Sequence, residues 1–288
     1  MTADSPADPL TTADHRRNRL GLTYVYPVVS RRAGGLSVGV NLNPNHACNW
    51  RCIYCQVPGL VRGTAPAIDL PLLERELGGF LDDVLRGDYL ARQVPDGMRR
   101  LNDIALSGDG EPTSAREFDR VVESIGRVRA ATGVPADVKT VLITNGSLIQ
   151  RPEVQSGVRA LAALNGEVWF KLDRATAEGI RAVNDVAVSA DAVRRNLVMA
   201  AHQCPTWVQT CVFAIDGQPP SDAEVDAYVE LLRAALAAGA PLRGVFLYGL
   251  ARPSMQPEAA RLSAVPPQWL GALERRVRAL GLAVSVTP

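Results

Sequence analysis

The sequence lacks the features that mark several classes of protein. It contains no apolar run long enough to cross a bilayer, and its first fourteen residues are polar and acidic with no apolar signal-like core. The sequence therefore predicts a cytoplasmic protein with no membrane partner. It also lacks a charge excess, because 31 basic and 30 acidic residues leave a net charge of +1. That balance gives no general attraction to nucleic acid.

What is present is the composition of one large globular domain. Of the 288 residues, 47% are hydrophobic and 21% are charged, which is ordinary for a soluble enzyme. Residues 1–18 are rich in Ala, Asp, Thr and Pro, which predicts a flexible N-terminal tail. Residues 19–288 are expected to form the core, ending in a C-terminal helix and strand.

Short apolar runs alternate with longer segments of helical periodicity. Strands are predicted over residues 37–42, 103–107, 140–144, 167–172, 207–215 and 244–248, and helices over residues 72–85, 118–131, 225–238 and 269–280. This rhythm predicts an α/β fold with a parallel sheet. A closed or half-closed barrel and an open doubly wound sheet both fit, and in either the site lies in the loops after the strands.

Residues typical of helix caps and turns support these boundaries. Ser114 and Ser221, each followed three residues later by Glu, predict capped helix starts. The Asn145–Gly146 and Asp216–Gly217 pairs predict turns.

Three of the five cysteines lie within eight residues, as Cys48, Cys52 and Cys55 in a C-x3-C-x2-C spacing after a predicted strand. In a reducing compartment such a cluster indicates a metal site. Soft sulfur ligands suit iron–sulfur centres or zinc, but a closed zinc site normally takes four protein ligands. Three cysteines leave one metal position open to another molecule. The alternative is a structural site completed by His46, Cys204 or Cys211.

The spacing C-x3-C-x-aromatic-C, with Tyr54 as the aromatic residue, resembles the signature of the radical S-adenosylmethionine (radical SAM) enzymes. The resemblance implies a partial (β/α)6 barrel with a short N-terminal extension. It also implies that Cys48, Cys52 and Cys55 bind a 4Fe-4S cluster whose fourth iron is chelated by the methionine part of S-adenosylmethionine. Tyr54 would pack near the adenine.

Downstream motifs extend the resemblance to other strand ends. Gly108, Gly110 and Glu111 resemble the glycine-rich motif that holds the amino group of S-adenosylmethionine, a task suited to a carboxylate. Asn145 would contact the ribose or methionine part, or serve only the turn. Asp173 is expected near the ribose hydroxyls or the substrate.

Four further residues are candidates for substrate contact: Lys171, Gln209, Tyr248 and Arg252. Lys171 and Arg252 suit an anionic group. The alternative for Lys171 is a salt bridge with Asp173 at the rim, and the alternative for Arg252 is a salt bridge that anchors its loop. Gln209 and Cys211 share one face of the fifth predicted strand. Cys211 is either core or a radical relay.

The ordered motifs resemble the iron–sulfur oxidoreductase branch that includes the tRNA wyosine-base synthesis (4-demethylwyosine synthase-like) enzymes. Residues 1–47 depart from that branch, because they contain no Cys and no Lys. The expected activity is reductive cleavage of S-adenosylmethionine to a 5′-deoxyadenosyl radical that takes hydrogen from an unidentified substrate. An external one-electron donor such as flavodoxin or ferredoxin would supply the electron.

Two alternatives remain at this point. A tRNA-modifying enzyme would place a basic rim, from Arg16 to Arg32, around the barrel mouth. A non-catalytic metal-binding protein would hold the metal without the chemistry. The substrate is accordingly a small molecule or a tRNA.

Overall fold

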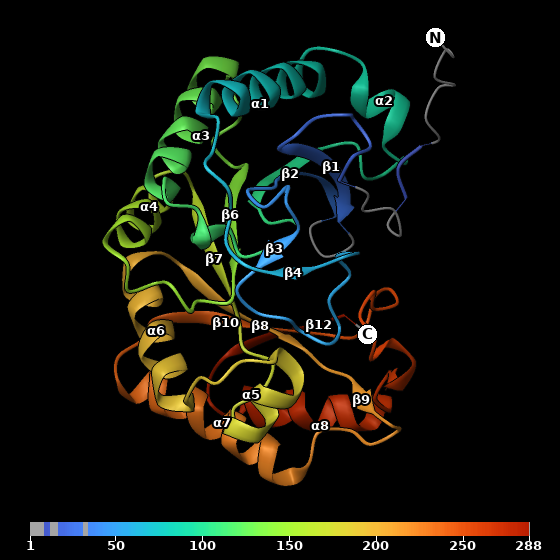
Figure 1. Cartoon of the computed structure of the whole chain (residues 1–288), viewed down its shortest axis with the longest axis vertical. Helices are drawn as coiled ribbons and strands as arrows, with labels where there is room; N and C mark the ends of the chain where they lie inside the picture. The colour runs from blue at the N-terminus through green and yellow to red at the C-terminus, as the bar shows by residue number, and fades with distance from the viewer. Residues whose placement is uncertain (1–8, 12–16, 31–33, 288) are drawn as a thin grey trace.

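The fold is built on one eight-stranded sheet, seen in a computed structural model that describes residues 9–11, 17–30 and 34–287 (Figure 1). The strand order is β1-β2-β5-β6-β7-β8-β10-β12. The strands are β1 (Val25–Ser30), β2 (Gly35–Val40), β5 (Leu101–Leu106), β6 (Lys139–Thr144), β7 (Gly166–Lys171), β8 (Thr206–Cys211), β10 (Leu242–Tyr248) and β12 (Ala283–Thr287). All neighbours pair in parallel except β1, which is antiparallel to β2.

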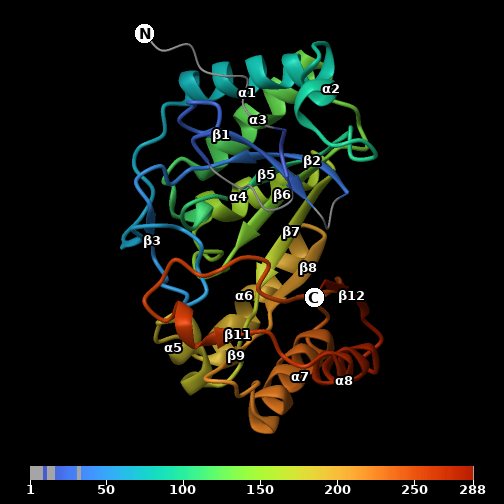
Figure 2. The ribbon, with the colours of Figure 1, turned by 90° about the vertical axis from the view of Figure 1, so that its right-hand side faces the viewer.

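Helices cover the outer face of this curved sheet (Figures 1 and 2). They are α1 (Leu70–Leu85), α2 (Tyr89–Gln93), α3 (Phe118–Thr132), α4 (Pro152–Ala162), α5 (Ala177–Asn184), α6 (Ala190–Gln203), α7 (Asp222–Ala237) and α8 (Pro267–Arg278). Because strand side chains alternate between faces, β2 sends Leu36, Val38 and Val40 to the core beneath the helices and turns Ser37 and Gly39 inward. The apolar core therefore lies outside the sheet, and the inner face is left for a site.

The six predicted strands are confirmed as β2, β5, β6, β7, β8 and β10, in that order, and they form the expected partial barrel. β1 and β12 add an edge strand at each side of the sheet, and β12 is the C-terminal strand expected after the last helix. Among the described residues the two edge strands, β1 and β12, do not pair with each other, so the barrel is not closed. The sequence prediction of helices omitted α2, α4, α5 and α6.

The fifth predicted strand, residues 207–215, is wrong in its second half. β8 ends at Cys211, and β9 (Ala214–Ile215) instead pairs with β11 (Leu262–Ser263). The turn after β9 forms where predicted, with Asp216 and Gly217 at φ +51° and +75°. The backbone breaks at Cys211 because its N–H leaves the ladder and donates to Asp173 Oδ1, 3.0 Å away.

The two predicted caps have different outcomes. Ser221 begins α7 and accepts a hydrogen bond from the Glu224 N–H, as expected. Ser114 does not cap α3, which begins after Glu117. Its hydroxyl donates to the Glu111 carbonyl within a short 3-10 turn (Pro112–Ser114), because that turn continues the loop after β5.

Most of the predicted tail, residues 1–8 and 12–16, lies outside the described residues. Within the described part, Leu10 is buried in the core and its N–H donates to the Gln93 carbonyl at 2.7 Å. The chain therefore already packs against the domain before residue 19.

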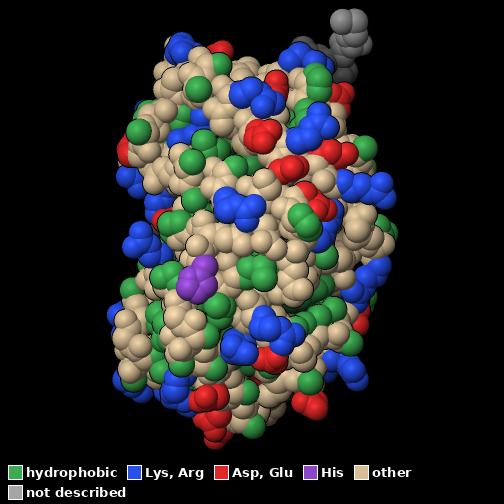
Figure 3. All heavy atoms as spheres, turned by 90° about the vertical axis from the view of Figure 1, so that its left-hand side faces the viewer, with side chains coloured by type: hydrophobic (Ala, Val, Ile, Leu, Met, Phe, Trp, Pro, Cys, Tyr) green, Lys and Arg blue, Asp and Glu red, His purple; other side chains and the backbone are tan. Residues whose placement is uncertain are grey.

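None of the helices in the described ranges combines the length and the apolar character needed to cross a membrane. On the helical face drawn in Figure 3, basic and acidic side chains are interspersed, in keeping with the balanced charge of the chain.

Candidate functional site

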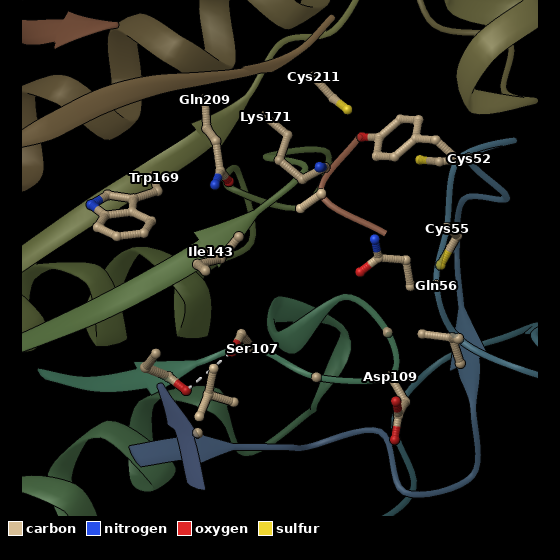
Figure 4. A pocket seen from close by; sticks show the side chains of 18 of the residues that line it. Cys52, Cys55, Gln56, Ser107, Asp109, Ile143, Trp169, Lys171, Gln209 and Cys211 are labelled. Atoms are coloured by element: carbon tan, nitrogen blue, oxygen red, sulfur yellow. Dashed lines mark hydrogen bonds between the residues drawn. The ribbon is translucent and has the colours of Figure 1, made fainter. Parts of the chain in front are cut away.

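The inner face of the sheet lines a cavity of about 360 Å³ at the carboxyl ends of the strands. Each parallel strand from β5 to β10 contributes inward side chains, and the cysteine loop closes the opposite wall (Figure 4). Of the predicted site residues, the cavity is lined by Cys48, Cys52, Tyr54, Cys55, Gly108, Gly110, Glu111, Asn145, Lys171, Gln209, Tyr248 and Arg252. Asp173 is not part of this wall, since it lies behind Tyr54.

The cysteine loop is fixed by backbone pairing on several sides. β3 (Ala47–Cys48) and β4 (Val61–Arg62) pair in parallel and so bring the two ends of the loop together. The Ile53 N–H donates to the Val183 carbonyl at 2.9 Å, and the Ser254 hydroxyl donates to the Ile53 carbonyl at 2.7 Å. The loop is thus held by α5 on one side and by the segment after β10 on the other.

Burial raises the pKa of all three loop thiols, to about 11 for Cys48 and about 12 for Cys52, and in the same direction for Cys55. Thiolates at these positions therefore need a stabilising cation, which a bound metal centre supplies. The donor set, three soft sulfurs beside an open cavity, fits an iron–sulfur cluster with one iron free to bind another molecule.

The geometry does not favour a closed zinc site. In the part of the chain that the structure describes, no three His, Cys, Asp or Glu side chains converge as they would around a single ion. A cubane cluster instead takes its cysteines on separate irons. Cys204 caps α6 and is buried in the core under the helices, while His46 Nδ1 lies 2.9 Å from the Pro58 carbonyl oxygen.

Tyr54 is anchored by its hydroxyl, which donates to Asp173 Oδ2 at 2.5 Å. Its ring packs against Phe213, with centroids 5.4 Å apart, and the Lys171 ammonium lies 4.9 Å from the ring centre. Asp173 also accepts from Asn184 Nδ2 and from the Cys211 N–H, both at 3.0 Å. The sequence predicts that Asp173 contacts the ribose or the substrate. In the structure its carboxylate instead accepts hydrogen bonds from Tyr54, Asn184 and Cys211.

The glycine-rich loop packs directly on the start of the cysteine loop. A Cβ on Gly110 would lie 2.1 Å from the Ala47 carbonyl oxygen, and a Cβ on Gly108 would lie 2.4 Å from Asn41 Oδ1. Only glycine allows this approach without a shift of the backbone. Gly108 and Gly110 therefore bring Glu111 close to Cys48.

Glu111 ties the loops after β5 and β6 together. Its Oε1 accepts from the Thr113 N–H and from the hydroxyls of Thr113 and Thr144, and its Oε2 accepts from the Asn145 N–H at 2.7 Å. Burial raises the pKa of Glu111, while these four donors stabilise the ionised form. Since Oε2 accepts only one of these bonds, it retains capacity for a further donor.

Asn145 bridges to the cysteine loop, because its Nδ2 donates to Asn49 Oδ1 at 2.9 Å. Its own Oδ1 accepts from the N–H and the hydroxyl of Ser147. The turn predicted at Asn145 and Gly146 also forms, since Gly146 adopts φ +68°. Asn145 is therefore both a turn residue and part of the cavity wall.

The four candidate substrate residues lie on adjacent elements. Lys171 is level with Gln209 across β7 and β8, and Figure 4 shows both side chains pointing into the cavity. Lys171 Nζ donates to the Tyr248 hydroxyl at 3.2 Å, and among the described residues it forms no ion pair with Asp173. Burial acts to lower the pKa of Lys171, but its interactions with Tyr248 and Asp173 outweigh burial, so the net direction of the pKa is upward. The Arg252 carbonyl accepts from Gln56 Nε2.

Sequence reasoning missed Asp103 and Asn184 in this region, and it included Arg17 only as part of a basic segment at the barrel mouth. Arg17 reaches the cavity wall and pairs with Asp109, whose Oδ1 lies 3.4 Å from its Nε. Asp103 is buried, lines the cavity and accepts from the Ser37 hydroxyl. Asn184 donates to Cys52 Sγ at 3.2 Å. Their spacing in sequence carries no signal, because each acts through a partner far along the chain.

The proposed basic rim is only partly described. Arg16, Arg31 and Arg32 lie outside the described residues. Arg17 faces the cavity, and Arg19 Nη2 donates to Gln93 Oε1 at 3.1 Å.

Comparison with solved structures defines the class of fold: the chain has the fold of the radical SAM enzymes, as the resemblance predicts. It is similar to a radical SAM methyltransferase from Sphaerobacter thermophilus, with a TM-score of 0.55, 16% identity, and coverage of 91% of this chain and 68% of that one. It is similar also to TYW1 with a lysine–pyruvate adduct bound, with a TM-score of 0.55, 13% identity, and coverage of 84% and 73%.

Sequence comparison gives shorter matches. A UPF0026 protein of Helicobacter pylori is 24% identical over 186 residues, which are 60% of this chain and 53% of that protein. A GTPase Obg of Brachyspira hyodysenteriae is 27% identical over 132 residues, 45% of this chain and 16% of that protein. The chain spans about half or less of the curated relatives it matches. No family model matches the chain.

Proposed function

We propose that this protein is a radical SAM enzyme in which Cys48, Cys52 and Cys55 hold a 4Fe-4S cluster and the cavity receives S-adenosylmethionine. The observation that supports this most is that the three cysteines, Tyr54 and the Glu111 loop all line one cavity. Such a cluster, held by Cys48, Cys52 and Cys55, would supply the one-electron reduction that cleaves S-adenosylmethionine to a 5′-deoxyadenosyl radical able to take hydrogen from the substrate. An external donor such as flavodoxin or ferredoxin provides that electron.

The residues of the chain bind and orient in this scheme. Glu111 Oε2 has capacity for a bond from the ammonium of S-adenosylmethionine, and a charge-assisted bond of this kind is strong. Tyr54 is fixed in place by Asp173 and offers its ring to the adenine. Asn145 faces the same cavity beside Glu111 and supplies a polar edge.

Lys171, Gln209, Tyr248 and Arg252 are proposed to contact the substrate. Lys171 suits an anionic group, since its described partners are the neutral Tyr248 hydroxyl and the ring of Tyr54. The substrate is a small molecule or a tRNA. Retention of tRNA in a low-salt pull-down that is lost at high salt supports RNA; a clean low-salt result counts against it.

Anaerobic reconstitution with iron and sulfide tests the function. We expect the wild-type protein to take up four irons and to form 5′-deoxyadenosine from S-adenosylmethionine when dithionite is added. Cys52→Ala should lose both, whereas the matched control Cys204→Ala should keep both, because Cys204 is buried away from the cavity. A wild-type cluster that yields no 5′-deoxyadenosine favours a non-catalytic metal-binding protein instead.

A further inference from the structure

Asn184, the last residue of α5, is fixed against the cysteine loop. Its carbonyl accepts from the Arg51 N–H at 3.2 Å, and the preceding Val183 carbonyl accepts from the Ile53 N–H at 2.9 Å. The side chain is only 2% exposed. The helix end and the loop therefore move as one unit, and the Asn184 amide has little room to turn.

The orientation of that amide is decided by its neighbours. Its Nδ2 lies 3.0 Å from Asp173 Oδ2 and 3.2 Å from Cys52 Sγ. Because an ionised carboxylate only accepts hydrogen bonds, Asp173 requires the NH₂ end of the amide at this position. The NH₂ group carries two hydrogens, one for the carboxylate and one for the sulfur. A cysteine sulfur that ligates a metal has no proton, so it also accepts.

We propose that Asn184 is a positioning residue that raises the reduction potential of the cluster by donating an N–H to Cys52 Sγ. This rests on the proposed function, because it takes Cys52 as a cluster ligand. Hydrogen bonds to the sulfurs of an iron–sulfur centre are among the factors that set its potential. Reduction adds negative charge at the sulfurs, so an N–H donor stabilises the reduced state more than the oxidised one.

Asp173 gives this donor its direction. It holds Asn184 through the same Oδ2 that accepts from the Tyr54 hydroxyl, and its Oδ1 accepts from the Cys211 N–H. The ends of β7, β8 and α5 and the cysteine loop therefore meet at one buried carboxylate. The hydrogen bond to Cys52 is preorganised by this network, and solvent does not compete for the amide.

The test is a redox titration of the reconstituted protein, monitored by the electron paramagnetic resonance signal of the reduced cluster. Asn184→Leu has nearly the same size but no N–H to donate. We expect it to hold as much iron and sulfide as the wild-type protein and to have a more negative midpoint potential. Asn184→Asp, a second variant of the same shape, replaces the donor with a carboxyl group and should also lower the potential.

Asn196→Leu is the matched control. Asn196 is likewise buried and makes two side-chain hydrogen bonds, to the Gly146 carbonyl and from Gln150, but neither bond reaches Cys48, Cys52 or Cys55. Its variant should keep the wild-type potential. An unchanged potential in the Asn184 variants, or an equal shift in the control, overturns the inference. A wild-type protein that binds no cluster would instead overturn the proposed function.

Discussion

Replacing Glu111 tests how far one carboxylate organises the site. In Glu111→Gln the amide has one oxygen and one NH₂ group. If the oxygen stays near Thr113, the Asn145 N–H loses its acceptor; if the amide is reversed, the Thr113 N–H loses it. The Thr113 and Thr144 hydroxyls can rotate to accept, but a backbone N–H cannot. Either orientation therefore leaves one buried N–H unpaired.

An unpaired buried donor costs about 1–3 kcal/mol, and the loss should fall near the lower end because glutamine does not bury a charge. Glu111→Ala removes the acceptor of both backbone N–H groups, so its free energy of unfolding should fall by roughly 2–6 kcal/mol. Urea denaturation of the cluster-free proteins measures both. Glu74→Gln is the control, because Glu74 forms an exposed ion pair with Arg127, and such pairs contribute little.

The same substitution should weaken cofactor binding. If Oε2 accepts from the ammonium of S-adenosylmethionine, losing a charge-assisted bond of about 1.5–3 kcal/mol raises the dissociation constant roughly 10- to 100-fold. Equilibrium dialysis with the reconstituted proteins measures it. A dissociation constant for Glu111→Gln within twofold of wild type, in a protein that is otherwise folded, would refute the assignment of Glu111.

Three further predictions concern residues around the cavity. Tyr54→Phe removes the 2.5 Å bond to Asp173 and should lower the free energy of unfolding by about 1.5–3 kcal/mol in urea; an unchanged value would contradict this anchoring. Gly146→Ala should cost about 2–4 kcal/mol, because Gly146 has φ +68° and a Cβ would lie 2.0 Å from the Phe170 ring. Gly239→Ala, at φ +82° in open space, should cost less, and equal losses would show that the ring contact is unimportant. Burial raises the pKa of Asp103, so the unfolded chain loses this proton at a lower pH than the folded protein does. The contribution of Asp103 to the free energy of unfolding therefore falls as pH rises from about 4 through the raised pKa. Asp103→Asn should become more stable relative to wild type over that range, and a difference in stability that does not change with pH would contradict the prediction.

Much of the fold is readable from local patterns. The strands β2, β5, β6, β7 and β10 follow from short apolar runs, since a parallel strand with helices on one face and a packed interior on the other reads as a continuous apolar run. The edge strand β12 is predicted as a C-terminal strand, but its position in the sheet is not. The omitted helices α4, α5 and α6 begin after Arg151, Thr176 and Ser189, in stretches that sequence reasoning leaves unassigned.

The sequence by itself determined the cysteine loop. The motif residues Cys48, Tyr54 and Cys55 lie within eight residues of sequence, so their chemistry can be predicted without knowing the fold. Glu111 can be recognised as a candidate site residue for the same reason, because Gly108 and Gly110 precede it closely in the sequence.

Only the tertiary structure decided what surrounds that loop. Asp173 is 119 residues from Tyr54, and Asn184 is 132 residues from Cys52, yet these side chains are in hydrogen-bond contact. No local pattern encodes such a pair, because the contact exists only once β7, α5 and the loop are packed together. The cysteines thus predict a metal centre, and the fold decides which carboxylate holds Tyr54 and which amide contacts the Cys52 sulfur.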